Sequence, residues 1–282
     1  MVTVSIKPVI RNILLLLIAL TVSCRGGSVI QVAEFPQQNQ TLPATITVVN
    51  WNAQKGKHPN FARDLKLLLY IEKPDIVFLQ EATSDLLEIG KMGGYFAEGW
   101  HYPWPNGVKI GVLTLSRIPP VRVKPVPTKY REFGITAPKV SLVSEYPLRN
   151  GDRLLALNVH LLNFERWSVK KIRHQIEALK NIMANHSGPI LITGDFNTWN
   201  QKRLELVKEV TQDMKLREVD QFPTGRRTGD VNSLFWNELL GIDKDIPIDR
   251  VFMRGFTPTE ARVLAYRSSD HSPILFSLAV NP

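Results

Sequence analysis

Cysteine is almost absent from this sequence, because the 282-residue chain contains only Cys24. An internal disulfide is therefore excluded, and the fold must be stabilised by its hydrophobic core alone. The chain also lacks low-complexity blocks, internal repeats and any linker that forces a division into separate domains. With 44% hydrophobic and 22% charged residues, it has the composition of a globular protein, and we expect no long disordered segment outside its ends.

The apolar stretch NILLLLIALTVSC, residues 12–24, is too short to span a bilayer comfortably. Because Lys7 and Arg11 precede it, the stretch is instead typical of a signal peptide. Residues 20–24, LTVSC, resemble the lipobox of bacterial lipoproteins, whose cysteine is acylated and becomes the new N-terminus. Thr21 stands where that motif most often has leucine. The resemblance predicts a lipoprotein-type signal peptide.

These features divide the chain into three parts: a signal peptide over residues 1–23, a flexible tether over residues 24–43 and one domain over residues 44–282. Acylation at Cys24 would hold the protein on a membrane of the bacterial cell envelope, facing the periplasm. The alternative is an ordinary cleaved signal with an incidental cysteine, which would give a periplasmic or secreted protein. We expect the protein to act as a monomer.

Acidic residues are in the minority, since 35 Lys and Arg face 26 Asp and Glu and give a formal net charge of +9. Residues 1–23 carry two of the basic side chains and none of the acidic ones, so the remainder keeps a charge of +7. Such a surface favours polyanions such as nucleic acid, anionic lipid or phosphorylated small molecules. In a lipoprotein the same charge can serve attraction to the membrane itself.

Hydrophobic periodicity predicts more strands than helices. Apolar residues at spacings of three and four indicate an amphipathic helix over residues 165–184, and Pro74 ends another helix. Mixed elements in which strands predominate favour sheet packed on sheet with helices outside. The further predicted helices cover residues 61–74 and 201–214, and the predicted strands cover residues 45–53, 75–82, 111–120, 137–148, 152–164, 190–193, 246–255, 261–267 and 272–280.

Polar side chains follow several predicted strands. In GPILITGDFNTWN, residues 188–200, a buried strand is followed by Asp195 and Asn197, and Gly194 permits a turn that a bulkier residue would resist. Each ending has an alternative interpretation, such as an Asx-type turn before a helix at Asn200 or a buried, satisfied histidine at His160. Together they suggest one cleft at the ends of the strands. The residues are Asn52, Glu81, His160, Asp195, Asn197, Asp249, Asp270 and His271.

The order of these motifs, WN, QE, NxH, GDFN, D and SDH, resembles the endonuclease/exonuclease/phosphatase superfamily, which contains the DNase-I-like nucleases. The resemblance runs from Thr45 to Val280, and it rests mainly on GDFN combined with a C-terminal SDH. It implies an α/β fold, a four-layered α/β/β/α sandwich in which two mostly antiparallel mixed sheets pack face to face with helices outside. Small bacterial members of the superfamily are the most similar in pattern.

The resemblance also implies a metal-dependent phosphoester hydrolase. Glu81 would be the principal ligand of Mg²⁺ or Mn²⁺, with Asn52 and Asp270 beside it, because hard cations prefer oxygen ligands. His271, oriented by Asp249, would be the general base for water. Four further roles are implied. Asp195 and Asn197 would position water and phosphate, His160 would donate to a phosphoryl oxygen or the leaving group, and Asn163 would contact phosphate.

Substrate choice stays open at this stage. Arg226 and Arg227, with Lys170, Lys171 and Arg173, favour nucleic acid, although the second cluster is more typical of a solvated helix face. An aromatic-rich segment over residues 93–107 would suit the lipid contact of a sphingomyelinase-like enzyme, base stacking or simple packing. The remaining alternatives are a small-molecule phosphatase and a lipid-anchored binding protein without catalysis. We expect an enzyme, because Glu81, Asp195, Asp249 and His271 are all present.

Overall fold

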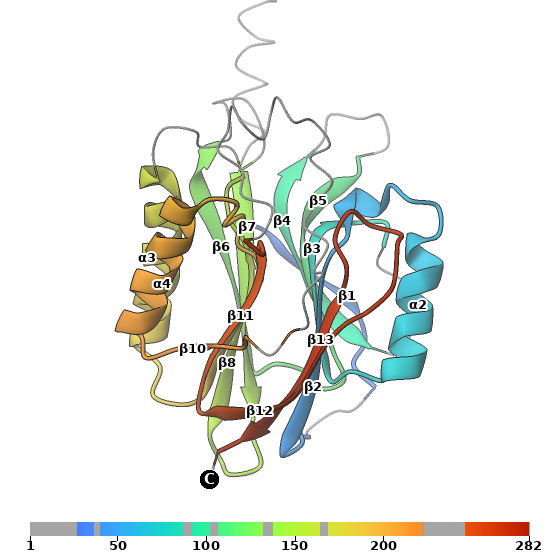
Figure 1. The fold of residues 1–282 in the computed structure, drawn as a ribbon. Helices are drawn as coiled ribbons and strands as arrows, with labels where there is room; N and C mark the ends of the chain where they lie inside the picture. The colour runs from blue at the N-terminus through green and yellow to red at the C-terminus, as the bar shows by residue number, and fades with distance from the viewer. Residues whose placement is uncertain are drawn as a thin grey trace, which may run out of the picture.

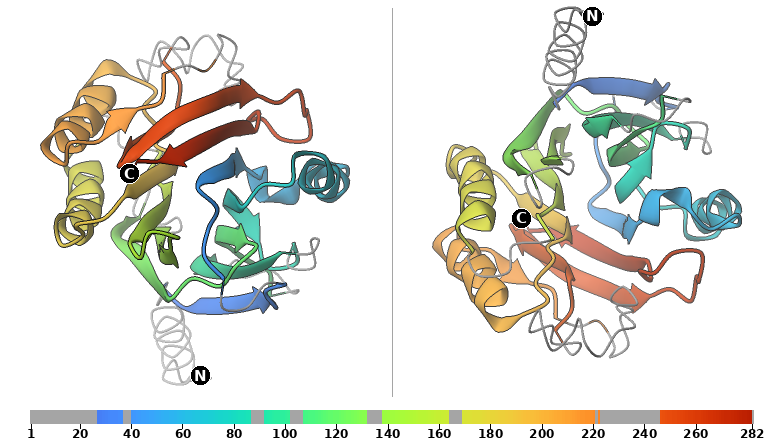
Figure 2. Two further views of the ribbon diagram at one scale, coloured as in Figure 1. Left: turned by 90° about the horizontal axis from the view of Figure 1, so that it is seen from below. Right: turned by 90° about the horizontal axis from the view of Figure 1, so that it is seen from above.

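The computed structural model describes residues 27–36, 40–86, 92–101, 107–131, 138–163, 169–220, 222 and 246–281. Two sheets pack face to face, and helices cover the outer face of each (Figure 1). Viewed along the sheets, helix α2 lies on one side of the molecule and helices α3 and α4 lie on the other (Figure 2). This confirms the four-layered α/β/β/α sandwich that the sequence predicts.

One sheet has seven strands in the order β1-β4-β5-β3-β2-β13-β12. Strands β2 and β3 pair in parallel, and the other neighbours in this sheet are antiparallel. The strands are β1 (Val29–Ala33), β2 (Thr45–Asn52), β3 (Ile76–Thr83), β4 (Gly93–His101), β5 (Lys109–Ser116), β12 (Phe256–Val263) and β13 (Ile274–Val280).

The second sheet has six strands in the order β10-β11-β9-β8-β7-β6. Here β8 and β9 are the parallel pair, and the other pairs are antiparallel. Both sheets are therefore mixed and mostly antiparallel, as expected. The strands are β6 (Arg122–Arg131), β7 (Pro138–Pro147), β8 (Arg153–His160), β9 (Ile190–Asp195), β10 (Arg217–Glu218) and β11 (Asp249–Arg254).

The three α-helices of the described ranges each bury one apolar stripe. Helix α2 (Phe61–Glu72) places Phe61, Leu65 and Leu68 against the seven-stranded sheet and ends before Pro74, which cannot continue a helix. Helices α3 (Lys170–Ala184) and α4 (Gln201–Asp213) pack on the six-stranded sheet. Asn200 caps α4, because its side chain accepts a hydrogen bond from the amide of Arg203.

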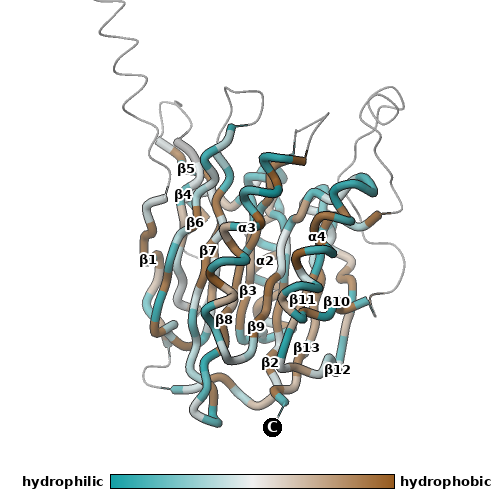
Figure 3. Tube along the Cα trace, turned by 90° about the vertical axis from the view of Figure 1, so that its left-hand side faces the viewer, coloured by the Kyte–Doolittle hydropathy of each residue, from teal (hydrophilic) through white to brown (hydrophobic). Residues whose placement is uncertain are grey.

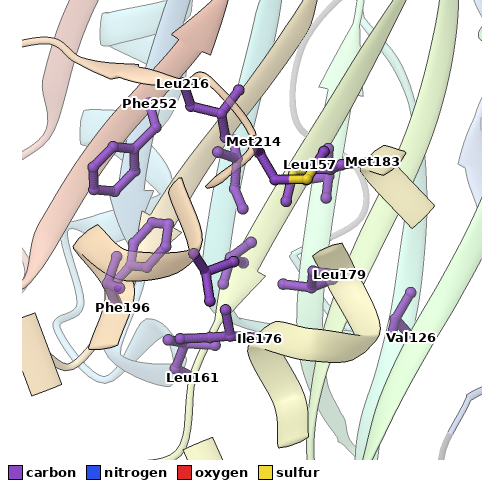
Figure 4. Close-up of a cluster of buried hydrophobic side chains, with 14 of the residues drawn as sticks. Val126, Leu157, Leu161, Ile176, Leu179, Met183, Phe196, Met214, Leu216 and Phe252 are labelled. Atoms are coloured by element: carbon purple, nitrogen blue, oxygen red, sulfur yellow. The ribbon is translucent and has the colours of Figure 1, made fainter. Parts of the chain in front are cut away.

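Hydrophobic side chains fill three interfaces between these layers. The central cluster joins the inner faces of the two sheets and includes Phe78, Leu191 and Phe276. A second cluster fills the space between the six-stranded sheet and helices α3 and α4 (Figure 4). The hydropathy of the chain follows this arrangement, with hydrophobic residues concentrated along the central strands and hydrophilic stretches on α3 and α4 (Figure 3). The core therefore holds the two sheets together without any disulfide.

Some sequence predictions need correction. The expected flexible tether over residues 24–43 contains strand β1, which pairs with β4, and Leu42, which is buried and bridges to Leu148. Strand β6 was missed because Pro125 and Pro127 interrupt its pattern, and such prolines are tolerated at a sheet edge. The aromatic-rich segment over residues 93–107 is largely strand β4, and residues 102–106 lie outside the described part.

The predicted signal peptide and Cys24 also lie outside the described residues. Among the helices that the structure does describe, none is long and apolar enough to cross a membrane.

Candidate active site

The predicted site residues meet where the two sheets share one end, uppermost in Figure 1. Asn52 and His160 are the last residues of β2 and β8, and Asp195 is the last residue of β9. The sequence pattern misplaced Asp249, which begins β11 rather than ending a strand. Because β11 runs antiparallel to β9, its first residue pairs with Asp195 and lies at the same edge.

Backbone geometry aims Glu81 at this edge. The register between β3 and β5 shifts between Leu79 and Ala82, so Glu81 lies in a β-bulge, and its φ of 46° is unusual for a residue other than glycine. Residues held in such conformations cost of order 1–3 kcal/mol and are common at functional sites. The strain at Glu81 is consistent with a side chain positioned for function.

Gly194 serves close packing rather than the turn that its sequence position suggests. It lies inside β9 with a φ of 149°, and a Cβ atom there would be 1.9 Å from the carbonyl oxygen of Val159. Any side chain would push β8 and β9 apart. Gly194 therefore allows His160 and Asp195 to face each other across the parallel pair, where they are register partners.

An ion pair joins His271 to Asp249 across the two sheets. The Nδ1 atom of His271 lies 2.7 Å from Oδ2 of Asp249, and both side chains are buried. Burial lowers the pKa of His271, but the charge and hydrogen bond of Asp249 outweigh it and raise that pKa to about 10. The backbone amide of His271 donates to Oγ of Ser269, and its carbonyl oxygen accepts from Nε1 of Trp51. The ring is thus fixed, with Nδ1 turned to Asp249 and Nε2 left for other partners.

Asp195 connects the two sheets from the opposite side of the site. Its Oδ2 accepts a hydrogen bond from Nδ2 of Asn52 at 3.0 Å, and its Oδ1 accepts from the amide of Asn197 at 2.9 Å. The second bond forms an Asx-type turn, which the sequence offered as an alternative to a role in the site. Asp195 makes this turn and also lies in the candidate site. Burial, opposed by the charge of His271 and reinforced by that of Asp249, raises the pKa of Asp195 to about 7. Asp195 therefore titrates near neutral pH.

Two lysines flank Glu81. Its Oε2 lies 3.2 Å from Nζ of Lys55, in the short 3-10 helix Gln54–Gly56, and its Oε1 lies 3.7 Å from Nζ of Lys139 in β7. Burial raises the pKa of Glu81, but its charged neighbours, above all Lys139 and also Lys55, lower it to about 2. Glu81 is therefore an anion throughout the physiological pH range.

Lys139 also determines the state of His160. The Nζ of Lys139 lies 3.0 Å from Nε2 of His160, and since an ammonium only donates, Nε2 is the acceptor. Burial and the charge of Lys139 hold the pKa of His160 well below its usual range. When Nε2 accepts, the neutral ring carries its N–H on Nδ1, so the expected donor role of His160 stays a prediction. The side chain of Lys139 lies beside both His160 and Glu81.

The GDFN segment is held from below by a buried arginine. Nη1 of Arg203 donates to the carbonyl oxygens of Asn197 and Leu162, and its guanidinium lies 4.1 Å from the ring centroid of Trp199. Asn197 has a φ of 50° and donates from Nδ2 to the carbonyl oxygen of Leu161. Asn163, the expected phosphate contact, accepts from Nε1 of Trp199 through both its carbonyl oxygen and Oδ1, at 3.1 Å each. These bonds link the loop to Trp199, and the phosphate contact of Asn163 stays a prediction.

Beneath the site, buried amides bridge the two sheets. Gln80 donates from Nε2 to Oδ1 of Asn50 at 2.8 Å and to Oδ1 of Asn158 at 2.7 Å. Asn158 in turn donates to the carbonyl oxygens of Leu79 and Leu113. Gln80 directly precedes Glu81, and Asn158 lies two residues before His160. The network therefore fixes the spacing between the strands that carry these two residues.

The residues fit a hard divalent cation. Among the described residues there is no group of three or more His, Cys, Asp or Glu placed to hold a metal ion. Mg²⁺ nevertheless needs only one or two carboxylates, with water and substrate oxygens completing its shell. Glu81 supplies a permanent anion. Oδ1 of Asn52 accepts from the amide of Gln54, and Ser269 donates to the carbonyl oxygen of Asn52 and lies 3.3 Å from Oδ1 of Asp270. Asn52 and Asp270 are thus linked through one hydroxyl.

Comparison with known proteins identifies the family of this chain. A family model described as the endonuclease/exonuclease/phosphatase family matches residues 49–271. The chain belongs to this family. It is also 30% identical over 238 residues to a UPF0294 protein of Vibrio parahaemolyticus, covering 84% of this chain and 78% of that protein.

Solved structures of family members share the fold. An endonuclease/exonuclease/phosphatase from Beutenbergia cavernae superposes with a TM-score of 0.62 and 17% identity, over 84% of this chain and 72% of that one. D. rerio TDP2, solved in complex with a single-strand DNA product, superposes with a TM-score of 0.61 and 14% identity, over 84% of this chain and 99% of that one. At such low identity these likenesses establish the architecture of this family member, a DNase-I-like sandwich.

Most of the residues gathered at this end of the family member were predicted from the sequence, but Lys139 and Arg203 were not. Lys139 lies at the second position of β7, directly after Pro138, and its pattern gave no sign that it faces Glu81. Arg203 is 1% exposed although it stands in an otherwise polar turn of α4. The basic pair Arg226 and Arg227 lies outside the described residues, and Arg173 on α3 pairs with Glu209.

Proposed function

We propose that this protein is a divalent-cation-dependent phosphodiesterase, using Mg²⁺ or Mn²⁺, that hydrolyses nucleic acid in the cell envelope. The observation that carries the proposal is the meeting of the Asp249–His271 pair with Asp195, Asn52 and Glu81 at one end of the two sheets. Charged groups of opposite sign, buried and held by both sheets, are the arrangement that phosphoryl transfer requires. The family of the chain is consistent with this chemistry.

Glu81, with Asn52 and Asp270 beside it, would hold the cation. When bound, the cation supplies positive charge that offsets the negative charge on the phosphoryl oxygens and the leaving oxygen. Lys55 and Lys139 lie close to Glu81, and the exposed Lys55 can move aside more readily because 43% of its side chain is exposed, against 16% for Lys139.

Proton transfer to and from water would fall to Asp195. Its raised pKa of about 7 allows it to accept a proton near neutral pH. The sequence predicts His271 as the base, but its pKa of about 10 keeps the ring protonated at that pH. We therefore assign His271 as the imidazolium that donates from Nε2 to a phosphoryl oxygen, with Asp249 stabilising its charge. The environments of Asp195 and His271 hold their pKa values apart, so one can act as the base and the other as the acid.

Lys139 would be a second cationic contact for the scissile phosphate. Its ammonium lies 3.0 Å from Nε2 of His160, which orients it without neutralising its charge. Asn197 would shape the position of the attacking water through its amide bond to Asp195. These residues bind and orient, and the chemistry needs no covalent intermediate on the protein.

Nucleic acid is the proposed substrate because of the charge. The formal net charge of +7 that remains without residues 1–23 attracts polyanions, and this attraction does not depend on the base sequence. Hydrolysis by direct attack of water on phosphorus suits internal phosphodiesters. A binding protein without catalysis is disfavoured, since the buried ion pair and the partly buried, strained carboxylate of Glu81 have no evident use in a protein that only binds.

The test is cleavage of supercoiled plasmid DNA by residues 25–282, with and without Mg²⁺, beside sphingomyelin as a second substrate. His271→Ala is expected to abolish cleavage, whereas His174→Ala is the matched control because His174 is exposed on α3 and stacks on Tyr130. Cation-dependent DNA cleavage that is lost only in His271→Ala supports the proposal. Cleavage of sphingomyelin alone would reassign the substrate, and full activity of His271→Ala would reject the site.

We also propose that the mature protein is held in the cell envelope through an acylated Cys24, as its lipobox-like segment suggests. Mass spectrometry of the membrane fraction should detect a diacylated N-terminal cysteine. Cys24→Ala should release the protein into the soluble envelope fraction. A soluble parent protein with an unmodified Cys24 would contradict the proposal and leave an ordinary secreted enzyme.

A further inference from the structure

Helix α2 exposes a second apolar stripe in addition to the one that it buries. Leu67 is 45% exposed, Tyr70 77% and Ile71 55%, and these are three of the five large hydrophobic side chains most exposed in the described ranges. Residues spaced by three and four lie on the same face of a helix. The exposed stripe is therefore continuous and faces away from the seven-stranded sheet.

The charges that α2 presents to solvent are positive. Its acidic side chains, Asp64 and Glu72, are each only 14% exposed and pair with Arg63 and Arg262. Arg63 itself is 70% exposed and Arg262 47%. The exposed basic residues in or directly after the helix are Arg63, Lys66 and Lys73. The outer face of α2 thus combines aliphatic and aromatic side chains with cationic ones and shows little negative charge.

We propose that this face, defined by Leu67, Tyr70 and Ile71 with Arg63 and Lys66, docks on an anionic lipid surface. Helices that lie in a membrane interface carry an apolar face flanked by Lys and Arg, whose charges attract anionic headgroups while their alkyl stems lie along apolar groups. Tyrosine suits this interface because one end of its ring is apolar and the other is polar.

The rest of the molecule leaves α2 accessible for such docking. It is the one described α-helix on its side of the sandwich. Helices α3 and α4 cover the opposite side and both pack on the six-stranded sheet (Figure 2). The chain preceding residue 27 carries the apolar segment predicted to end in a lipid-modified Cys24, which would bring a bilayer close. The inference does not depend on the proposed catalysis.

Helix α2 is connected to the candidate active site through the segment that precedes it. The helix begins shortly after the 3-10 helix that carries Lys55, and Lys55 contacts Glu81. The open end of the sheets and the first turn of α2 are therefore neighbours along the chain.

The experiment measures sedimentation of residues 25–282 with vesicles of phosphatidylcholine alone or of equal parts phosphatidylcholine and phosphatidylglycerol. This chain retains every described element and every core cluster formed by the described residues. Ile71→Ser is compared with Val121→Ser, since the two side chains are 55% and 53% exposed but Val121 lies outside α2. Charge is tested by Lys66→Gln against Lys124→Gln, an exposed lysine on β6.

We expect binding to the anionic vesicles, a loss of about tenfold in Ile71→Ser and a smaller loss in Lys66→Gln, with both control variants unchanged. Circular dichroism confirms that each variant is folded. Absence of binding by the parent chain, or equal binding by Ile71→Ser and Val121→Ser, would overturn the proposal. A parent dimer in solution that Ile71→Ser converts to monomer would also overturn it, because the stripe would then be an interface between copies.

Discussion

The ion pair between Asp249 and His271 gives the sharpest test of the site, through the substitution Asp249→Asn. Asparagine keeps the shape of the side chain and an acceptor for Nδ1 but removes the charge. Burial lowers the pKa of His271, and the two contributions of Asp249 are the largest that raise it, ahead of those of Asp195 and Asp270. We therefore expect the pKa of His271 to fall by roughly 2 units or more in the variant.

The same shift makes a prediction about stability. In the native protein the pKa of His271 is about 10, against an unfolded value near 6.5, so the protonated ring is favoured in the folded state. This contribution to the free energy of unfolding, about 5 kcal/mol at roughly 1.36 kcal/mol per unit, is fully present below pH 6.5. It is lost as the pH rises from 6.5 to about 10. In Asp249→Asn the pKa of His271 in the folded protein is lower, so the pH range over which this stability is lost should end at a lower pH.

The assay is a titration of the His271 ring by ¹⁵N NMR in chelator-treated protein, with urea unfolding at several pH values across the same window. Asp152→Asn is the control, since Asp152 lies in an exposed turn and its side chain accepts a hydrogen bond from the neighbouring Asn150. A native His271 that titrates at its ordinary pKa would refute the reasoning. So would an equal titration curve in Asp249→Asn, because the carboxylate would then not be the cause of the shift.

Three further substitutions test the surroundings of the site. Lys139→Met should lower kcat at least about tenfold with little change in the free energy of unfolding. Steady-state kinetics measures kcat, with Lys124→Met as the control, and an unchanged kcat would show that Lys139 does not contact the phosphate. Gln80→Leu should cost about 2–3 kcal/mol in urea unfolding, because it leaves buried amide oxygens without their donor; a stability equal to the native value would show that the network does not bridge the sheets. Arg203→Met should lower the free energy of unfolding by about 3 kcal/mol and reduce activity, because Arg203 holds the carbonyl oxygen of Asn197. The exposed Lys202→Met should change neither. Intact activity in Arg203→Met would show that this arginine does not position the GDFN loop.

The sequence already contained the architecture and most of the site. Alternating and continuous apolar runs located β2, β3, β8, β9 and β13, because a buried strand needs apolar side chains wherever it packs. Helices α2, α3 and α4 followed from their stripes at spacings of three and four. Strands β1 and β6 were not predicted from the sequence. Both are edge strands, which bury little apolar surface and resemble loops in composition.

The residues with polar side chains at strand ends were also visible in the sequence. Asn52, Glu81, His160, Asp195 and His271 all lie at the shared end of the sheets, because the strand ends of a sandwich meet at one edge. Their chemical type could be read directly, since carboxylate, amide and imidazole groups keep their intrinsic chemistry in any fold.

Only the tertiary structure decided the charges of these groups and the residues that control them. Lys139 and Arg203 come from distant parts of the sequence, and their partners are reached only when β7 and α4 pack on the six-stranded sheet. The protonated His271, the neutral His160 and the near-neutral pKa of Asp195 depend on burial and on distances of a few ångströms across two sheets. A sequence fixes which groups can ionise, whereas their environment, assembled from distant segments, fixes whether they do.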